Sequence, residues 1–199
     1  MKHRQSGFTL VEIAIVLVII GLLLGGVLKG QEMIANAKYK SLRSEVQSYA
    51  AAFYSFQDRY RALPGDFDQA SVKLDAAAPN GNGGGTINGG YCNAAGDESC
   101  MVWQHLRYAG LIPGDPTDTG GDANPNHPYG GPYSGIYSGS NGGRSGIWLI
   151  VQNLSTEAAQ RLDEDIDDGV ANTGSVFCAN CGGATYPANR TNLQIRVLF

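Results

Sequence analysis

The fold of this chain is decided by QSGFTLVEIAIVLVIIGLLLGGVL, the stretch from Gln5 to Leu28. From Phe8 onwards the stretch is apolar apart from Thr9, Glu12 and glycines. As an α-helix, the residues from Phe8 to Leu28 span about 30 Å, which is the thickness of the hydrocarbon core of a bilayer. We therefore expect this stretch to cross a membrane.

Glu12 is the one acid in the apolar run. A carboxylate at the centre of a membrane-spanning helix costs about 2.5 to 3.5 kcal/mol on insertion scales, and less near the interface. Glu12 therefore needs a partner or a function, unless it is an interfacial side chain that lies one turn inside the membrane without a further role.

The residues around the start of the run carry a family resemblance. KHRQSG, followed by FTLVE, resembles the leader and first mature residues of type IV pilins and of the pseudopilins of type II secretion. In that family the prepilin peptidase cuts after the glycine and N-methylates the new terminal Phe. The resemblance implies cleavage after Gly7, methylation of Phe8 and a role for Glu12 in assembly. Lys29 stands where many members have a proline, so the helix kink that this proline produces is not carried over.

The same resemblance implies a location and a set of partners. The chain would be a single-pass protein of the bacterial inner membrane with its head in the periplasm, and would then join an extracellular or periplasmic filament. Its partners would be the prepilin peptidase, the inner membrane and other pilin or pseudopilin subunits. No cofactor is expected.

Basic residues flank the apolar run on both sides. Two precede it and several follow it, namely Lys2 and Arg4, then Lys29, Lys38, Lys40 and Arg43. The positive-inside rule alone therefore does not place the N-terminus in the cytoplasm.

An ordinary secretory signal peptide is the alternative interpretation of the N-terminal segment. Its small-residue cleavage site would be Ala35-Asn36-Ala37. The apolar core would then be longer than the usual 7 to about 15 residues. Phe8 at the N-terminus of the mature protein would exclude this alternative.

The helical pattern continues beyond the apolar run. Apolar or small residues alternate at gaps of four and three, at Ala35, Tyr39, Leu42, Val46, Tyr49, Phe53, Phe56 and Tyr60. Such spacing is typical of a helix that buries one stripe. We expect one helix over residues 8–62, because the residue before a proline, here Pro64, is disfavoured in the helical conformation.

The sequence thus predicts four segments. They are a leader of residues 1–7, a membrane-spanning or filament-core helix of residues 8–28, its amphipathic continuation over residues 29–62, and a globular head of residues 63–199 rich in glycine loops. The net charge of −4 gives no sign of a basic surface, so a nucleic-acid partner is not predicted.

Four cysteines lie in the predicted head, at Cys92, Cys100, Cys178 and Cys181. In an oxidising compartment an even number of cysteines indicates disulfides. We favour the local pairs, Cys92 with Cys100 and Cys178 with Cys181, because each closes a short loop containing Gly or Asn. A zinc site is the alternative, although only Cys178 and Cys181 have the usual ligand spacing.

The head contains both helix and strand patterns. We expect helices over residues 98–109 and 155–167, and strands over residues 146–152, 175–178 and 192–199. Strands that come late and are separated by turns favour an antiparallel sheet packed on the amphipathic half of the long helix, an α+β fold. The pilin resemblance implies the same architecture.

Two glycine-rich segments show no such pattern. Residues 80–90 lack the features of a phosphate-binding loop and are interpreted as a flexible connection. Residues 113–146 are interpreted as a long irregular loop, in which Tyr129, Tyr133 and Tyr137 are four residues apart. These tyrosines either form an exposed contact surface or pack the loop onto the sheet. An exposed surface would make the chain a membrane-anchored or secreted binding module, which is the alternative to a filament subunit.

Candidate metal and catalytic residues are few. Calcium ligands would be four acids at the end of a predicted helix, Asp163, Asp165, Asp167 and Asp168. The EF-hand pattern fails, because Asp168 and Gly174 occupy the positions that need Gly and Glu. Some pseudopilins bind calcium near the C-terminal sheet, so an irregular site stays open by resemblance. His105 and His127 accompany no nucleophile motif, and we expect no enzyme.

Overall fold

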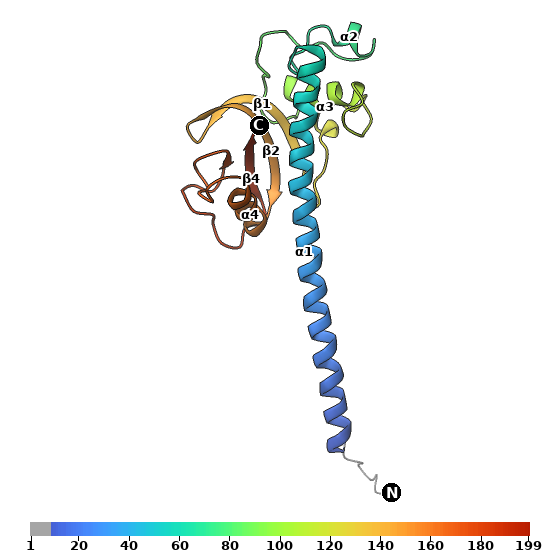
Figure 1. Cartoon of the computed structure of the whole chain (residues 1–199), viewed down its shortest axis with the longest axis vertical. Coiled ribbons are helices and arrows are strands. Elements are labelled where there is room, and N and C mark those ends of the chain that lie inside the picture. Colours follow the sequence, from blue (N-terminus) through green and yellow to red (C-terminus); the bar gives the residue numbers. More distant parts are fainter. Residues whose placement is uncertain (1–8) are drawn as a thin grey trace, which may run out of the picture. The chain divides into compact units, whose positions relative to one another are not determined.

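The computed structural model describes residues 9–199 (Figure 1). Helix α1 extends from Leu10 to Tyr60 and passes through Lys29 without a break. The chain forms two compact units, one up to Lys40 and the other from Ser41 to the C-terminus. The second part of α1 therefore belongs to the same compact unit as the head.

The stripe predicted for the second part of α1 packs into the head from Tyr39 onwards, whereas Ala35, predicted as its first residue, is exposed. Leu42, Val46, Phe53 and Phe56 are each at most 3% exposed. The ring of Phe53 meets the ring of Phe199 edge to face, with centroids 6.0 Å apart. This part of α1 thus packs against the sheet through one apolar face, as its spacing predicts.

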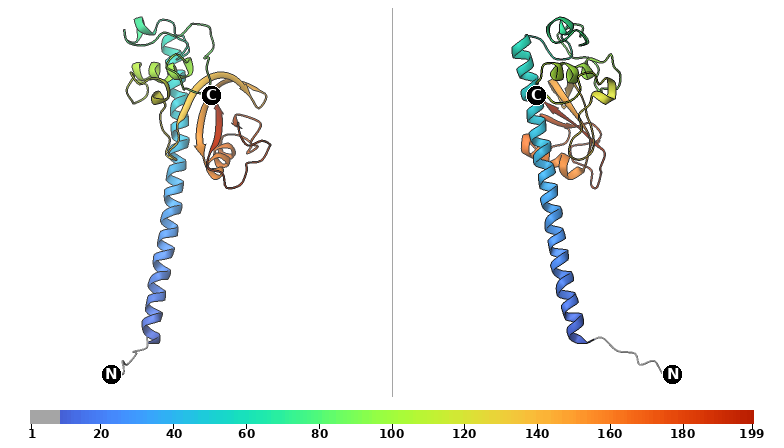
Figure 2. Two further views of the ribbon diagram at one scale, coloured as in Figure 1. Left: turned by 180° about the vertical axis from the view of Figure 1, so that it is seen from behind. Right: turned by 90° about the vertical axis from the view of Figure 1, so that its right-hand side faces the viewer.

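The head is built on a four-stranded antiparallel sheet (Figure 2). The strands are β1 (Tyr133–Asn141), β2 (Arg144–Leu154), β3 (Val176–Cys178) and β4 (Leu193–Leu198), in the spatial order β1-β2-β4-β3. Their alternating residues include Leu149, Val151, Ile195 and Val197, all buried. The long helix on a small antiparallel sheet gives the α+β, pilin-like fold that the sequence predicts.

Short helices cover the rest of the head. They are α2 (Ala70–Lys73), α3 (Glu98–Tyr108), the 3-10 helix η1 (Gly120–Ala123) and α4 (Thr156–Ile166). The sequence predicts α3 and α4 but neither α2 nor η1. Ser155 is the N-cap of α4, as expected, since its side chain accepts a hydrogen bond from the Ala158 amide at 3.3 Å.

The interpretation of residues 113–146 as one irregular loop is wrong, because β1 lies within it. The strand pairs with β2 from Tyr133, opposite Val151, to Asn141, opposite Arg144. Glycine and serine have weak intrinsic strand propensity, so the pairing with a strongly apolar neighbour, not local preference, makes this segment extended. Gly135, with φ +125°, lies at the irregularity near the start of β1.

The segment of residues 80–90 is not the flexible connection that its composition predicts. Two buried carboxylates fix its backbone by accepting hydrogen bonds from its amides. Asp66 accepts hydrogen bonds from the Gly84 and Gly85 amides, both at 2.8 Å. Glu98, 5% exposed, accepts from the Asn88 amide at 2.8 Å. The backbone of this segment is thus paired by acids from distant positions in the sequence.

The same segment, together with Cys92 just after it, also covers the free edge of β1. The Ser138 amide donates to the Ile87 carbonyl at 2.9 Å, and the Cys92 amide donates to the Ser134 carbonyl at 2.6 Å. Ile87 is 1% exposed. An uncovered edge strand is a template for unwanted pairing with other chains, so this cover protects the sheet.

Candidate functional site

The N-terminus of α1 is closed by a reciprocal pair of hydrogen bonds between Thr9 and Glu12. The Glu12 carboxylate accepts from the Thr9 amide and from the Thr9 hydroxyl, both at 2.8 Å. The Thr9 hydroxyl oxygen in turn accepts from the Glu12 amide at 3.3 Å. This is a capping box, in which two of the amides left unpaired at a helix start are satisfied.

The capping box gives Glu12 a partner within its own chain. A negative side chain in the first turn also interacts favourably with the positive end of the helix dipole. Hydrophobicity alone predicts that Glu12 needs a partner or a function, and does not point to Thr9 as that partner. The signal is present nonetheless, because Thr-x-x-Glu before an apolar run is the pattern of a capping box.

The first part of α1 presents an exposed apolar surface. Every residue from Leu10 to Leu28 is exposed, including large side chains such as Leu17, Leu22 and Leu23, each more than 60% exposed. In the described part of the chain, α1 is the one helix long and apolar enough to cross a membrane. Such a surface is stable in lipid or against other apolar helices, and unfavourable in water.

Four glycines divide this surface into two small-residue pairs. Gly21 and Gly25 are four residues apart, as are Gly26 and Gly30. At 100° per residue, the two pairs lie on roughly opposite faces of the helix. A Cβ atom added at any of the four would meet no atom of the chain within 4 Å. Their absent side chains therefore leave space for a neighbouring backbone and fill no need of the subunit's own fold.

Comparison with known proteins agrees with this geometry. A family model described as the prokaryotic N-terminal methylation motif matches residues 2–28. The chain carries the prepilin-type motif of type IV pilins and pseudopilins. Neither a curated protein nor a solved structure matches the chain. Proteins with the prepilin-type motif are structural subunits processed by a peptidase, not enzymes.

The prepilin-type motif covers each processing residue predicted from the sequence. Glu12 lies inside the helix, at its third position. Gly7 and Phe8 lie outside the residues that the structure describes, so cleavage after Gly7 and methylation of Phe8 stay predictions. The assembly role of Glu12 also stays a prediction.

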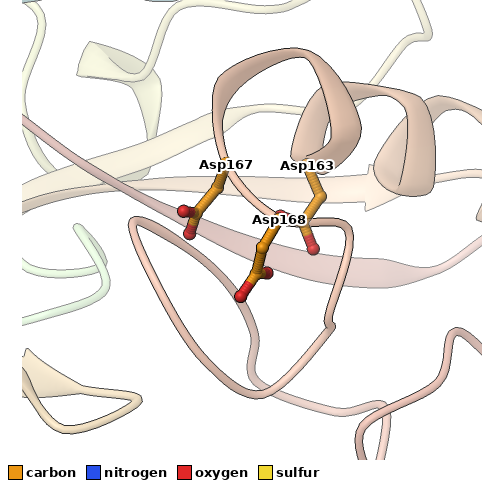
Figure 3. Close-up of side chains that lie close together, drawn as sticks. All are labelled: Asp163, Asp167 and Asp168. Atoms are coloured by element: carbon orange, nitrogen blue, oxygen red, sulfur yellow. The ribbon is translucent and has the colours of Figure 1, made fainter.

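Three of the four candidate calcium ligands come together at the end of α4 (Figure 3). Oxygen atoms of Asp163, Asp167 and Asp168 lie within 4.8 Å of one another. Asp165 is not part of this group, and its carboxylate lies 3.6 Å from the Arg43 guanidinium.

Each of the three clustered acids already accepts hydrogen bonds. Asp163 accepts from the Tyr186 hydroxyl at 2.8 Å, and burial raises the pKa of its carboxyl above the ordinary value. Asp163 also accepts from the Gly169 amide at 3.3 Å. Asp167 accepts from the Ser175 and Val176 amides, and Asp168 from the Val170 amide and the Thr173 hydroxyl. The cluster thus receives protein hydrogen-bond donors from the loop after α4.

The three tyrosines of the glycine-rich region do not share one surface. Tyr133 is fully buried, and its hydroxyl donates to the Glu45 carboxylate on α1 at 2.8 Å. Tyr129 and Tyr137 are half-buried. The hydroxyl of Tyr137 accepts from the Asn141 amide group at 2.9 Å. The sequence leaves two alternatives, an exposed contact surface or packing onto the sheet. Tyr133 follows the second, because its side chain is buried in the head.

The two histidines are part of the packed head. The Nδ1 atom of His105 accepts from the Gly65 amide at 2.8 Å, so its proton lies on Nε2, which donates to the Pro79 carbonyl at 2.7 Å. His127 makes the corresponding pair of bonds with the Tyr129 amide and the Gln152 carbonyl. Burial lowers the pKa of both imidazoles below the ordinary value. Both imidazoles are thus neutral, and each joins two backbone segments of the head by hydrogen bonds.

The cysteines form the two local pairs favoured from the sequence. One disulfide joins Cys92 to Cys100 and ties the segment at the edge of β1 to α3. The other joins Cys178 to Cys181 at the end of β3. No cysteine among the described residues is free.

Proposed function

We propose that the chain is a subunit of a type IV pilus or of a type II secretion pseudopilus. The prepilin peptidase would cut it after Gly7 and methylate Phe8. The apolar part of α1 would hold it in the bacterial inner membrane, with the head in the periplasm, until it moves into the filament. The observation that carries this proposal is the exposed apolar face of residues 10–28, which lies within the match to the prepilin-type motif.

Burial of this face explains how a membrane helix leaves the bilayer. Helices of neighbouring subunits would replace lipid around residues 10–28, so that apolar side chains stay out of water. The pairs Gly21–Gly25 and Gly26–Gly30 would let neighbouring backbones approach from two sides. Glycine costs about 1 kcal/mol relative to alanine inside a helix, so four glycines with open space around them favour a function between chains.

Glu12 would act at the start of the filament core. After cleavage, Phe8 would carry the positively charged N-terminus, and the carboxylate of Glu12 in an adjacent subunit would neutralise it. A low dielectric strengthens such a charge-assisted contact. The capping box supports this role, because it holds the carboxylate at the helix start while the subunit waits in the membrane.

This assignment gives each segment of the chain a role. Residues 1–7 would be the leader, residues 8–28 the membrane and filament core, residues 29–62 the continuation of the helix into the head, and residues 63–199 the head. The helix would give the filament its apolar centre, and the head its outer surface.

The alternative of a binding module receives less support. It depends on an exposed surface of Tyr129, Tyr133 and Tyr137, whereas Tyr133 lies in the core of the head. This alternative would also account for the exposed apolar part of α1 only as a membrane anchor.

Imaging of surface filaments, in cells with and without this chain, tests the proposal when combined with assays for secreted enzymes. Loss of surface filaments with normal secretion would indicate a pilus subunit. Loss of secretion without surface filaments would indicate a pseudopilin. If the mature chain stayed in the membrane and both properties were unchanged, the filament function would be refuted.

A further inference from the structure

Charge is unevenly distributed between the two compact units. Residues 29–40, here called the basic segment, contain Lys29, Lys38 and Lys40 against the single acid Glu32. Residues 41–199 contain nine Lys and Arg against sixteen Asp and Glu, a net charge of −7 with His neutral. The helix just beyond the apolar run and the head thus have opposite sign.

Two lysines of the basic segment have no anionic partner. Lys29 pairs with Glu32 at 2.8 Å. Lys38 and Lys40 are exposed, and no carboxylate in residues 9–199 lies within 4.0 Å of either ammonium group. At 100° per residue they point to roughly opposite sides of α1, so a neighbour on either side meets one of them.

The head offers acids that match these lysines. The acidic end of α4 is defined as Glu164, Asp165, Asp167 and Asp168, and the Asp165 carboxylate lies 3.6 Å from the Arg43 guanidinium. Glu164 and Asp168 are exposed, and neither forms an ion pair with a Lys or Arg of residues 9–199. Because Arg43 belongs to α1, the chain already contains one contact between this end of α4 and a basic side chain of that helix.

The position of Lys38 and Lys40 along α1 disfavours lipid headgroups as their binding partner. Lys38 lies ten residues beyond Leu28, about 15 Å along a helix. The polar layer outside the hydrocarbon core is only about 5 to 8 Å thick on each side of a bilayer. An upright helix therefore carries Lys38 and Lys40 past the headgroups, where a protein partner can reach them.

We propose that the basic segment is a docking surface between subunits, and that it receives the acidic end of α4 on the head of a second copy of this chain. This inference rests on the proposed filament function and names a contact within it. Exposed ion pairs are individually weak. Repeated at every subunit, they select the register of neighbours and reject like-charged arrangements, which is the usual contribution of complementary charge at interfaces.

A charge-swap experiment in the full-length chain tests this interface. The double change Lys38→Glu and Lys40→Glu should lower the yield of sheared filaments about tenfold or more, while the amount of subunit in the membrane stays the same. Adding Glu164→Lys to that chain should restore part of the yield. The matched control is Arg144→Glu, an exposed reversal of a basic residue on the head, which should leave the yield unchanged.

The other outcomes overturn the interface in distinguishable ways. Unchanged filament yield from the double variant would refute it while leaving the filament function intact. A fall in membrane-bound subunit would assign the lysines to lipid headgroups instead. A loss that Glu164→Lys does not relieve would refute the acidic end of α4 as the occupant. If the unchanged chain formed neither a surface pilus nor a pseudopilus, the proposed function itself would fail, and this contact with it.

Discussion

The hydroxyl of Tyr133, the first residue of β1, donates a 2.8 Å hydrogen bond to the carboxylate of Glu45 on α1. The contact joins two residues that are 88 positions apart in the sequence. Burial, together with the nearby Glu45 charge, raises the pKa of Tyr133 far above its ordinary value, so the hydroxyl remains a donor at all physiological pH values. It anchors the glycine-rich start of β1 to the helix.

Tyr133→Phe should therefore lower the free energy of unfolding of the head by about 1 to 3 kcal/mol, because a hydrogen bond to a charged acceptor is lost. Chemical denaturation of the full chain in detergent measures this change. Tyr137→Phe is the matched control, since its hydroxyl is half-buried and pairs only with a neutral amide. Equal effects of the two changes would contradict the anchoring role of Tyr133.

Two variants separate the capping and charge functions of Glu12. Glu12→Gln keeps an acceptor for the Thr9 amide but removes the negative charge, whereas Glu12→Ala removes both. We expect both variants to insert and to be cut after Gly7, and both to assemble poorly. Only Glu12→Ala should fray the first turn, at a cost of about 1 kcal/mol. Sheared-filament yield and hydrogen exchange at the helix start measure the two effects. Normal filaments from Glu12→Gln would show that capping alone suffices.

Alanine at the glycine pairs should separate folding from assembly. Gly25→Ala and Gly26→Ala add a methyl group where nothing in the subunit lies within 4 Å, so the helix should be stabilised by about 1 kcal/mol for each change. Filament yield should nevertheless fall, because neighbouring helices can no longer approach as closely. Ala35→Ser, an exposed change outside the pairs, is the control. Undiminished filament yield from both alanine variants would mean that the glycines are not helix contacts.

The buried histidines predict a loss of head stability in mild acid. Burial lowers the pKa of His105 below its ordinary value, while the Pro79 carbonyl and the Glu98 charge partly oppose this shift. The folded state therefore favours the neutral imidazole. This stabilisation is complete above the unfolded-state pKa of about 6.5, and it is lost as the pH falls through that value towards the lower folded-state pKa.

Melting temperatures between pH 8 and about pH 5 test this expectation. His105→Gln should lower stability at neutral pH and also flatten its dependence on pH. His127→Gln should act in the same direction, because burial lowers the pKa of that imidazole too. Identical pH slopes for the original chain and both variants would argue against buried neutral histidines.

Calcium provides a further test at the end of α4. Because hydrogen bonds already reach Asp163, Asp167 and Asp168, we expect no heat in a calorimetric titration with calcium and no rise in melting temperature. Burial raises the folded-state pKa of Asp163, so its ionised form is disfavoured by folding at neutral pH. Asp163→Asn, which resembles the neutral carboxyl, should then raise stability at pH 7 and have little effect in acid, where Asp163 is itself protonated. Stabilisation by calcium that disappears in Asp163→Asn would establish a metal site.

Local patterns in the sequence account for much of this molecule. The apolar stripe from Leu42 to Phe56 has the helical period, and the helix forms where that period predicts it. The Ser155 cap and the two disulfides are also short-range features, since each joins residues no more than eight positions apart. Such features depend on neighbours along the chain, and a single sequence contains those neighbours.

The sequence by itself determined the long helix, its apolar half and the prepilin-type motif that includes this half, because the residues of one continuous segment are sufficient for all three. Only the tertiary structure decided that residues 133–141 form a strand, that Asp66 and Glu98 order residues 80–90, and that Tyr133 belongs to the core. In these cases the stabilising group lies far away in the chain, and weak local propensity is overruled by backbone pairing and burial.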